Sequence, residues 1–243
     1  MIANYPAHDV TRVRGGHTLR IRLADPLAEA WYDRDATPAG MEFLREQGVL
    51  IRGARVFDFG AHQGVVALAL ARDVGETGQV VAVEADPHNA RIAEINRGLN
   101  SAENLTVIHA AGAATEGSLS FSEGMNGRVE GRDALVEVAA LTVDGLAREH
   151  GTPNLVVIDV EGYEEQVLNG AAKTLENDLT SFLVEVHDRA TLSAYGANAD
   201  AIAERFLAFN RYVSASERAP FVPLEGPLPA GRFFLAAIPA THG

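Results

Sequence analysis

Residues 56–64 of this 243-residue chain read Val-Phe-Asp-Phe-Gly-Ala-His-Gln-Gly, and this stretch decides the fold. A short apolar run contains Asp58, two glycines follow four residues apart, and the segment from Val65 to Arg72 is largely apolar. This order predicts a strand, a glycine turn and a helix. Glycines at such a turn let the backbone approach a ligand closely, and the following helix offers free N–H groups to negative atoms.

An acidic residue stands at the end of the second apolar run. Residues 80–83 read Val-Val-Ala-Val, and Glu84 follows them, 24 positions after Gly60. A carboxylate at that place can accept hydrogen bonds from both hydroxyls of a ribose. The glycine turn and Glu84 together indicate that the protein binds a nucleoside-containing cofactor.

Strands and helices alternate through the middle of the chain. The hydrophobic pattern predicts strands at residues 55–59, 79–84, 104–109, 154–159 and 181–187, and helices at residues 64–73, 87–99, 162–176 and 198–210. Asp86 can cap the second helix, and Pro87 suits its first turn. Alternating units with nearly all-apolar strands imply an α/β sandwich of three layers, with a mostly parallel sheet covered on both faces.

The remaining segments extend this core. Residues 17–23 alternate as a half-buried strand does, and residues 40–47 are predicted to be a helix. Residues 115–140 have the pattern of a hairpin or an irregular excursion. Residues 219–230 contain four prolines and suit a long loop. The apolar run at residues 233–238 predicts a buried strand close to the C-terminus. The last two strands, with a loop and no helix between them, should pair antiparallel.

Length and composition suit one large domain. We predict an N-terminal extension at residues 1–39, packed on a core domain at residues 40–243. The formal net charge of −13 disfavours nucleic acid or an anionic membrane as the main partner. The absence of cysteine rules out disulfides, thiolate catalysis and cysteine-ligated metals. Because neither a signal peptide nor a membrane span is visible, we expect a cytoplasmic protein.

The glycine turn favours a cofactor without phosphate. A dinucleotide-binding turn has the form Gly-x-Gly-x-x-Gly, whereas here His62 stands at the second glycine position. A pyrophosphate pressed onto the turn would meet that side chain. S-adenosylmethionine has no phosphate and needs less clearance, so it suits the turn better than NAD. A nicotinamide-dependent oxidoreductase and a catalytically silent cofactor-binding module are the alternatives.

Two segments carry a family resemblance. Residues 58–64, Asp-Phe-Gly-Ala-His-Gln-Gly, resemble motif I of class I S-adenosylmethionine-dependent methyltransferases. Residues 158–171, Ile-Asp-Val-Glu-Gly-Tyr-Glu-Glu-Gln-Val-Leu-Asn-Gly-Ala, are similar to the corresponding stretch of the FkbM family, as are residues 141–146. The resemblance spans residues 40–190 and implies a Rossmann-like, seven-stranded sheet with one antiparallel C-terminal strand. The family's turn usually has Asn where this chain has His62.

The resemblance also implies an activity and a cofactor site. The family methylates hydroxyl oxygens, often on sugars or natural products. The methionine half of the cofactor would be surrounded by Asp58, Gly60, Ala61, His62 and Gly64. The ribose would be held by Glu84. The adenosine would lie near Ala85, Asp86 and Ala111.

Methyl transfer to a hydroxyl needs a base or a metal near the acceptor oxygen. Asp159 and Glu161 stand two residues apart at the end of the fourth core strand, and Glu185 and His187 do so at the end of the fifth. Such spacing places each pair on one side of its strand. Because chemistry gathers at the carboxyl ends of parallel strands, we expect His187 or Asp159 to take the acceptor's proton, with Glu161 orienting it.

Other roles for these residues stay open. Asp159, Glu161 and His187 can instead hold a divalent cation such as Mg²⁺, which prefers hard oxygen ligands. Glu161 can also simply begin the following helix, favoured by the helix dipole, and Glu185 can pair with an arginine.

The sequence thus predicts an S-adenosylmethionine-dependent O-methyltransferase that acts on a hydroxylated small metabolite, sugar or natural product. N-methylation uses the same cofactor fold and stays open. The acceptor should be recognised by residues 115–140, residues 219–230 and the N-terminal extension. In that extension, Trp31 and Tyr32 can cover the cofactor or substrate, or anchor the extension on the core. A homo-oligomer is compatible with the sequence.

Overall fold

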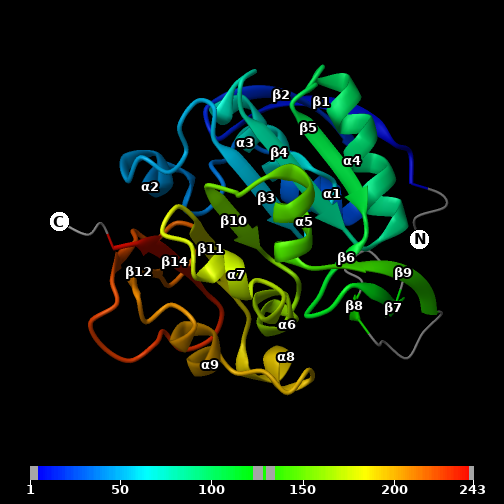
Figure 1. The fold of residues 1–243 in the computed structure, drawn as a ribbon. Helices are drawn as coiled ribbons and strands as arrows, with labels where there is room; N and C mark the ends of the chain where they lie inside the picture. The colour runs from blue at the N-terminus through cyan, green and yellow to red at the C-terminus, as the bar shows by residue number, and fades with distance from the viewer. Residues whose placement is uncertain (1–4, 123–127, 130–134, 241–243) are drawn as a thin grey trace.

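The computed structural model describes residues 5–122, 128–129 and 135–240, and an eight-stranded sheet lies at its centre (Figure 1). The strands follow the order β13-β12-β14-β11-β10-β3-β4-β5. Five neighbours are parallel: β3 (Arg55–Phe59), β4 (Gln79–Glu84), β5 (Leu105–His109), β10 (Leu155–Ile158) and β11 (Ser181–Val186). The strand β14 (Phe233–Pro239) runs antiparallel to β11 and to β12 (Phe209–Ser214).

This sheet confirms the predicted fold class. Seven of its strands, β3 to β5, β10 to β12 and β14, form the expected mostly parallel sheet with one antiparallel C-terminal strand. The two-residue β13 (Val222–Pro223) adds to the edge beyond β12 and lies within the predicted loop. The predicted core strands begin and end within one residue of the observed ones.

Of the four helices predicted for the core, two match the structure and two need correction. The helices α3 (Val65–Val74) and α4 (Pro87–Leu99) match their predictions. The helix predicted at 162–176 is divided into α6 (Glu164–Asn169) and α7 (Ala172–Leu175). Gly170 separates them, and an added Cβ there would lie 2.2 Å from the Ala113 carbonyl oxygen, so the break lies where the chain packs tightly against another backbone.

The helix predicted at 198–210 is too long. The helix α9 (Ala199–Glu204) ends early, and residues 209–214 form β12, a strand that the sequence analysis missed. All six residues of β12 pair with β14. Because this strand depends on pairing with β14, which follows beyond the predicted loop, tertiary pairing overrides the local helical pattern.

Successive side chains of the central strands pack on opposite faces of the sheet. Val56 belongs to a core shared with α3 and the N-terminal hairpin. Its neighbour Phe57 belongs to a second core, shared with α5 (Val143–His150), α6 and α9. The sheet is therefore covered on both sides, as its apolar strands require, and α3 and α5 lie on opposite faces (Figure 1).

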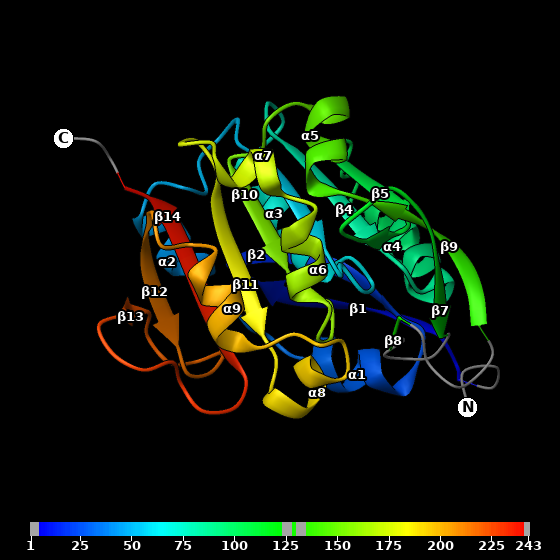
Figure 2. The ribbon, with the colours of Figure 1, turned by 60° about the horizontal axis from the view of Figure 1, so that its bottom comes forward.

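The N-terminal residues form a hairpin and a helix. The hairpin joins β1 (His8–Arg14) to β2 (His17–Leu23) and packs on α3 and α4. The helix α1 (Pro26–Tyr32) follows, and α2 (Met41–Glu46) leads into β3. In Figure 2, α1 lies at the end of the molecule toward which the arrow of β11 points. The N-terminal residues thus reach the carboxyl ends of the central strands.

Asparagine side chains of α4 hold the hairpin in place. The Arg20 N–H donates to Asn100 Oδ1 at 3.0 Å, and the Arg22 N–H donates to Asn96 Oδ1 at 2.7 Å. The Asn96 amide in turn donates to the Gln63 carbonyl oxygen at 2.8 Å. The hairpin is therefore linked through α4 to the glycine turn that the sequence singled out.

The predicted excursion at residues 115–140 forms a second sheet. Its strands are β6 (Ala111–Gly112), β7 (Gly117–Ser122), β8 (Arg128–Val129) and β9 (Leu135–Leu141), in the order β6-β9-β7-β8. β7 and β9 pair antiparallel, as a hairpin does. Residues 123–127 and 130–134 of the excursion lie outside the described residues.

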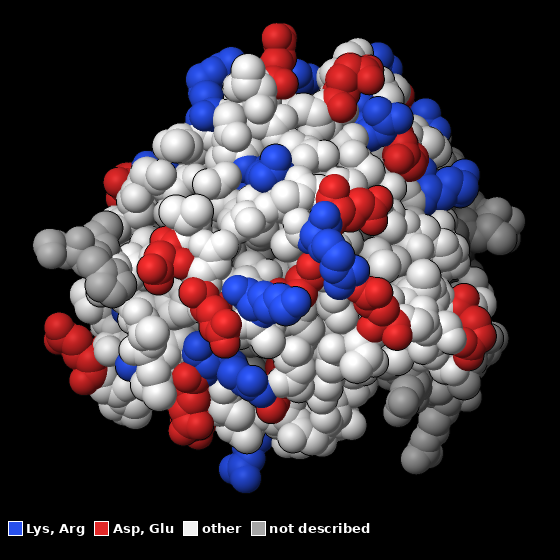
Figure 3. All heavy atoms as spheres, in the orientation of Figure 1, with Lys and Arg blue, Asp and Glu red and all other residues white. Residues whose placement is uncertain are grey.

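The surface charges and the lengths of the helices bear on the kind of partner that the protein can contact. Acidic and basic side chains are interspersed over the face shown in Figure 3. Within the described ranges, none of the helices combines the length and apolar character that crossing a membrane requires.

Candidate active site

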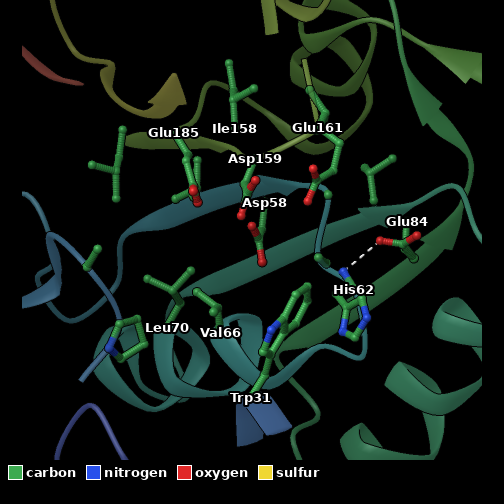
Figure 4. Close-up of a pocket in the computed structure, with 18 of the residues that line it drawn as sticks. Trp31, Asp58, His62, Val66, Leu70, Glu84, Ile158, Asp159, Glu161 and Glu185 are labelled. Atoms are coloured by element: carbon green, nitrogen blue, oxygen red, sulfur yellow. Dashed lines mark hydrogen bonds between the residues drawn. The ribbon is translucent and has the colours of Figure 1, made fainter. Parts of the chain in front are cut away.

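Four carboxylates from four neighbouring strands line one cavity of about 310 Å³ (Figure 4). We call them the floor: Asp58 on β3, Glu84 at the end of β4, Asp159 just after β10 and Glu185 on β11. Because side chains alternate along a strand, Asp58 faces the same side of the sheet as Val56, toward α3 and the N-terminal residues. The floor therefore gathers acidic groups at the carboxyl ends of the parallel strands.

Several residues of the N-terminal segment line the cavity, and we call three of them the roof: Arg14, Trp31 and Tyr32. In Figure 4, Trp31 lies across the cavity from Asp58, Asp159 and Glu185. The centroid of the Trp31 ring lies 5.1 Å from that of His62. The Arg14 guanidinium lies over the Tyr32 ring, 5.6 Å from its centroid.

The roof is anchored to the glycine turn by the buried carboxylate of Asp25. This carboxylate caps α1 by accepting from the Ala28 N–H at 2.8 Å, and it also accepts from the Gln63 side-chain amide. His88 Nε2 lies 3.1 Å from the same carboxylate. At the other end of α1, the Tyr32 hydroxyl lies 2.8 Å from His62 Nδ1. The fixed position of α1 thus depends on two residues of the turn itself.

The backbone of the glycine turn explains its residue types. Gly60 has φ +85°, and an added Cβ would lie 1.7 Å from the Asp159 carbonyl oxygen, so only glycine fits. His62 also has a positive φ, of 49°. Asn and His are among the residues that adopt this left-handed conformation most readily. The backbone therefore accounts both for the Asn usual in similar turns and for its replacement by His62.

Glu84 is held by backbone N–H groups from two sides. The His62 N–H donates to Glu84 Oε2 at 2.7 Å, and the Asp86 N–H donates to Oε1 at 2.8 Å. Burial raises the pKa of Glu84 to about 7, although these two bonds act in the opposite direction. Each carboxylate oxygen keeps a further lone pair for another donor. Glu84 is thus oriented as a ribose-binding carboxylate needs to be.

Asp58 is a buried carboxylate with an unsatisfied oxygen. Its side chain is 3% exposed, and Oδ2 has no hydrogen-bond partner within the part of the chain that the structure describes. Burial, and then the charge of Asp159, raise the pKa of Asp58 to about 7. A buried carboxylate is strongly unfavourable unless a donor or cation approaches it. The cavity thus offers a place for a positively charged ligand group.

Asp159, Glu161 and His187 come together as predicted, and we call them the trio. His187 Nε2 lies 3.3 Å from Glu161 Oε2 and 3.9 Å from Asp159 Oδ1. Glu161 has φ +54°, which turns it out of the path of the strand. Asp159 and Glu161 line the cavity, whereas His187 is buried behind them. The three side chains of the trio are therefore in mutual contact, and its two carboxylates face the cavity.

A fourth residue, Glu164, orients the histidine. Its buried carboxylate accepts from the Gly162 N–H at 2.9 Å and lies 2.8 Å from His187 Nδ1. Burial lowers the pKa of His187, but the bonds with Glu161 and Glu164 outweigh it and raise the pKa to about 10. Burial raises the pKa of Asp159 to about 6, while the charge of His187 opposes that shift. The carboxylates thus stabilise the protonated form of His187, and the charged histidine in turn stabilises the ionised form of Asp159.

Residues 58–212 match the family model described as the methyltransferase FkbM domain, which is more than half of the chain. The chain belongs to the FkbM methyltransferase family. It is accordingly an S-adenosylmethionine-dependent methyltransferase, and the nicotinamide alternative is set aside. No curated protein matches the chain.

Solved methyltransferase structures are similar to this FkbM-family chain at low identity. The FkbM methyltransferase from Methylobacillus flagellatus KT is 15% identical, with a TM-score of 0.46, over 75% of this chain and 43% of that one. A methyltransferase from Aquifex aeolicus is 14% identical, with a TM-score of 0.49, over 88% and 93%. An O-methyltransferase from Thermotoga maritima is 17% identical, with a TM-score of 0.48, over 98% and 80%.

S-adenosylmethionine fits the residues around the cavity of this FkbM-family protein. The cofactor carries a sulfonium and an ammonium against one carboxylate, so its net charge suits the acidic floor. The unsatisfied Asp58 oxygen would face a positive group, and the two oriented oxygens of Glu84 would accept from the ribose hydroxyls. The backbone of the turn from Gly60 to His62 would approach the methionine half.

The expected cofactor residues fall into two groups. Seven line the cavity: Asp58, Gly60, Ala61, His62, Glu84, Ala85 and Ala111. Gly64 and Asp86 do not line it. Gly64 has φ +74° and immediately precedes α3, where an added Cβ would lie 3.0 Å from Ala93 Cβ. Asp86 caps α4 by accepting from the Asn89 N–H at 3.0 Å. In this structure these two support the turn and the helix rather than border the cavity.

Sequence reasoning missed several residues of the site. Arg14, Arg34, Glu217 and Arg232 line the cavity, and no motif marked them. Tyr163 also lines it; this residue belongs to the motif at residues 158–171 but was given no role. Arg232 could have been found, because it precedes the strand that pairs with β11, and it forms the ion pair with Glu185 that was one of the two expected roles of that residue. None of the described residues between 115 and 140 lines the cavity.

Proposed function

We propose that the protein methylates a hydroxyl oxygen of a small molecule, and that Asp159 is the base that takes the acceptor's proton. The observation that carries this proposal is the position of Asp159, which lines the cavity between Glu185 and Glu161 and beside Asp58 (Figure 4). Bound S-adenosylmethionine supplies a methyl group on a sulfonium, which departs as a neutral thioether. The acceptor oxygen must also be made nucleophilic. A carboxylate within hydrogen-bond reach does this by taking the proton of the hydroxyl group.

His187 and Glu161 act on Asp159 rather than directly on the acceptor. His187 is 4% exposed and does not line the cavity, so its ring reaches the acceptor only through the carboxylates in front of it. Glu164 holds Nδ1, which directs Nε2 toward Glu161 and Asp159. We therefore assign proton transfer to Asp159, orientation of the acceptor hydroxyl to Glu161, and positioning of both to His187.

A divalent cation such as Mg²⁺ is the second arrangement that this site supports. One ligand atom from each of Asp159, Glu161 and His187 can be chosen so that all three lie within 4.8 Å of one another. A carboxylate that holds the far nitrogen of a ligating histidine, as Glu164 does here, is typical of metal sites. Such a cation would lower the pKa of the acceptor hydroxyl, and Asp159 would then be a ligand.

The central test is an acceptor screen with methyl-labelled S-adenosylmethionine. The panel contains sugars, polyols and phenols, together with amines of matched shape. We expect the label on an oxygen, and we expect Asp159→Asn to lower kcat by roughly 10²–10⁴-fold while cofactor affinity changes by less than about threefold. The matched control is Asp178→Asn, an exposed carboxylate away from the cavity.

Three outcomes would contradict the proposal. Label on nitrogen would replace O-methylation by N-methylation. Unchanged turnover by Asp159→Asn would remove the base. Cofactor binding without any methylated product, across the panel and with cell extracts as acceptor, would favour the catalytically silent module.

A chelation experiment decides between the two arrangements of the trio. If the trio binds a cation, treatment with EDTA abolishes turnover, added Mg²⁺ restores it, and His187→Gln weakens the response to Mg²⁺. If the trio acts without a cation, turnover is the same after EDTA and dialysis as before.

A further inference from the structure

Arg14 is the last residue of β1, and it is the only arginine in the described ranges whose side chain is buried. It is 6% exposed and lines the cavity from the roof. Gly15 follows with φ +60°, and its N–H donates to the Ala36 carbonyl oxygen at 3.0 Å. This hydrogen bond links the segment after α1 to the residue next to Arg14. It therefore helps to hold the Arg14 side chain over the cavity.

The hydrogen-bonding capacity of Arg14 is only partly used. Its Nη1 donates to the carbonyl oxygens of Trp31 and Arg34, at 3.4 and 3.2 Å. Its Nε is buried and has no hydrogen-bond partner among the described residues. Burial lowers the pKa of Arg14, and Glu217 and Asp35 oppose that shift, but neither forms an ion pair with it. A guanidinium stays charged in proteins, and a buried charge is unfavourable without a counter-charge.

The position of Arg14 points to one end of the cofactor. Its guanidinium lies over the Tyr32 ring, and the Tyr32 hydroxyl lies 2.8 Å from His62 Nδ1. Arg14 therefore borders the same part of the cavity as the glycine turn, where the methionine half is expected. Elsewhere the cavity presents carboxylates, which would repel a carboxylate on the ligand. Of the other two arginines that line the cavity, Arg232 is already paired with Glu185, and Arg34 is exposed to solvent.

We propose that Arg14 binds the carboxylate at the amino-acid end of S-adenosylmethionine, so that the N-terminal hairpin forms part of the cofactor site. A guanidinium can hold a carboxylate through two parallel N–H donors. Nε, which lacks a partner, and one Nη form such a fork. The proposal rests on the cofactor class of the family and is independent of the methyl acceptor.

The test compares two cofactors that differ only in this carboxylate. Binding of S-adenosylmethionine and of decarboxylated S-adenosylmethionine is measured by calorimetry, without any acceptor. The wild-type protein is expected to bind the complete cofactor roughly 10- to 100-fold more tightly. In Arg14→Gln, which keeps a side chain of similar shape without the charge, this preference is expected to fall below about threefold, while binding of the decarboxylated cofactor stays within about twofold.

Arg20→Gln is the matched control, because Arg20 lies on the same hairpin as Arg14 but is exposed and does not line the cavity. It should leave the preference unchanged. If Arg14→Gln does not fold, the wild-type measurement alone is decisive: equal binding of the two cofactors would overturn the proposal. It would also be overturned if folded Arg14→Gln kept the full preference. In either case the partner of Arg14 would be an anionic group of the acceptor instead. A failure to methylate hydroxyls leaves these measurements unaffected.

Discussion

The floor and the roof of the cavity differ in chemistry and in how they are held. The floor presents carboxylates from four neighbouring strands, each fixed by the pairing of the sheet. The roof presents two aromatic rings and Arg14 from residues that precede the core. Its place depends on side-chain hydrogen bonds, mainly those of Asp25 and of the asparagines of α4.

This difference separates two contributions to ligand binding. The floor supplies negative charge in a rigid frame, which suits a cation and the donors of a ribose. The roof supplies one positive charge and apolar surface on a segment that can shift without breaking the sheet. Substitutions of Asp58 or Glu84 in the floor should therefore change cofactor affinity with little effect on the fold, whereas substitutions at the anchor of the roof should change stability and affinity together.

The largest effect is expected at Glu84. Glu84→Ala removes the expected acceptor of the ribose hydroxyls and leaves the N–H groups of His62 and Asp86 without their partner. Because hydrogen bonds to a charged group are worth about 1.5–3 kcal/mol each, S-adenosylmethionine should bind roughly 100-fold more weakly, as measured by calorimetry. Glu94→Gln on the exposed side of α4 is the control. A dissociation constant within threefold of wild type would exclude Glu84 from the cofactor site.

The second effect concerns the anchor of the roof. Asp25→Ala removes the cap of α1 and the partner of Gln63, so we expect the free energy of unfolding to fall by about 2 kcal/mol. Denaturant unfolding measures this change. Trp31 is the only tryptophan in the chain, so its emission reports on the roof directly. We expect a red shift in the variant at denaturant concentrations where far-ultraviolet circular dichroism still shows the intact fold.

Asp33→Ala is the matched control for the anchor, because Asp33 stands at the other end of α1 and pairs with Arg12 near the surface. Surface ion pairs contribute about 0–1 kcal/mol, so both stability and emission should change little. Equal destabilisation by the two variants would mean that Asp25 has no special role in holding the roof.

The floor was largely predictable from the sequence, and the reason is local. Asp58, Glu84 and Asp159 each interrupt an apolar run at or near the end of a strand, and the alternation of a strand fixes the face of each. Neighbouring parallel strands then bring the three together without any further information. The apolar pattern alone was sufficient for these strands because both of their faces are buried.

The roof could not be predicted, because its place depends on contacts distant in sequence. Arg14 lies at the cavity in a segment that is held by the contacts of Asp25 with Gln63 and of Arg22 with Asn96, and no local pattern marks these pairs. The burial of His187 behind the cavity was hidden for another reason. It follows from the positive φ of Glu161, which places that carboxylate in front of the ring.

A smaller effect follows from the pKa of Glu84, which burial raises to about 7 from its ordinary value near 4.5. Only the ionised carboxylate accepts from both ribose hydroxyls, so affinity should rise about tenfold from pH 6 to pH 8 and then level off. Asp58, with its pKa raised to about 7, acts in the same direction. Calorimetry across this range tests the effect, and Glu84→Gln should flatten the profile. An affinity that falls with pH would contradict this account.

The raised pKa of Glu84 affects the stability of the cofactor-free protein in the opposite direction: as pH rises, affinity for the cofactor increases but stability decreases. Between pH 4.5 and 7 the folded protein keeps protons on Glu84 that the unfolded chain has lost, so the free energy of unfolding falls as pH rises through this window. Melting temperatures with and without S-adenosylmethionine should therefore diverge as pH increases. Parallel curves would mean that Glu84 is not the titrating group that binds the cofactor.

The smallest effect is expected for His62→Asn, which restores the residue usual at this turn. Asn adopts the left-handed backbone of His62 without strain, so the turn and its N–H bond to Glu84 should persist. The variant loses the contact of Nδ1 with the Tyr32 hydroxyl on the roof. We expect stability to change by less than about 1 kcal/mol and affinity by less than about fivefold. His62→Val is the informative companion, because a β-branched residue is strained at positive φ and should weaken binding much more. If the two variants behave alike, the histidine ring rather than the backbone conformation is what the cofactor site requires.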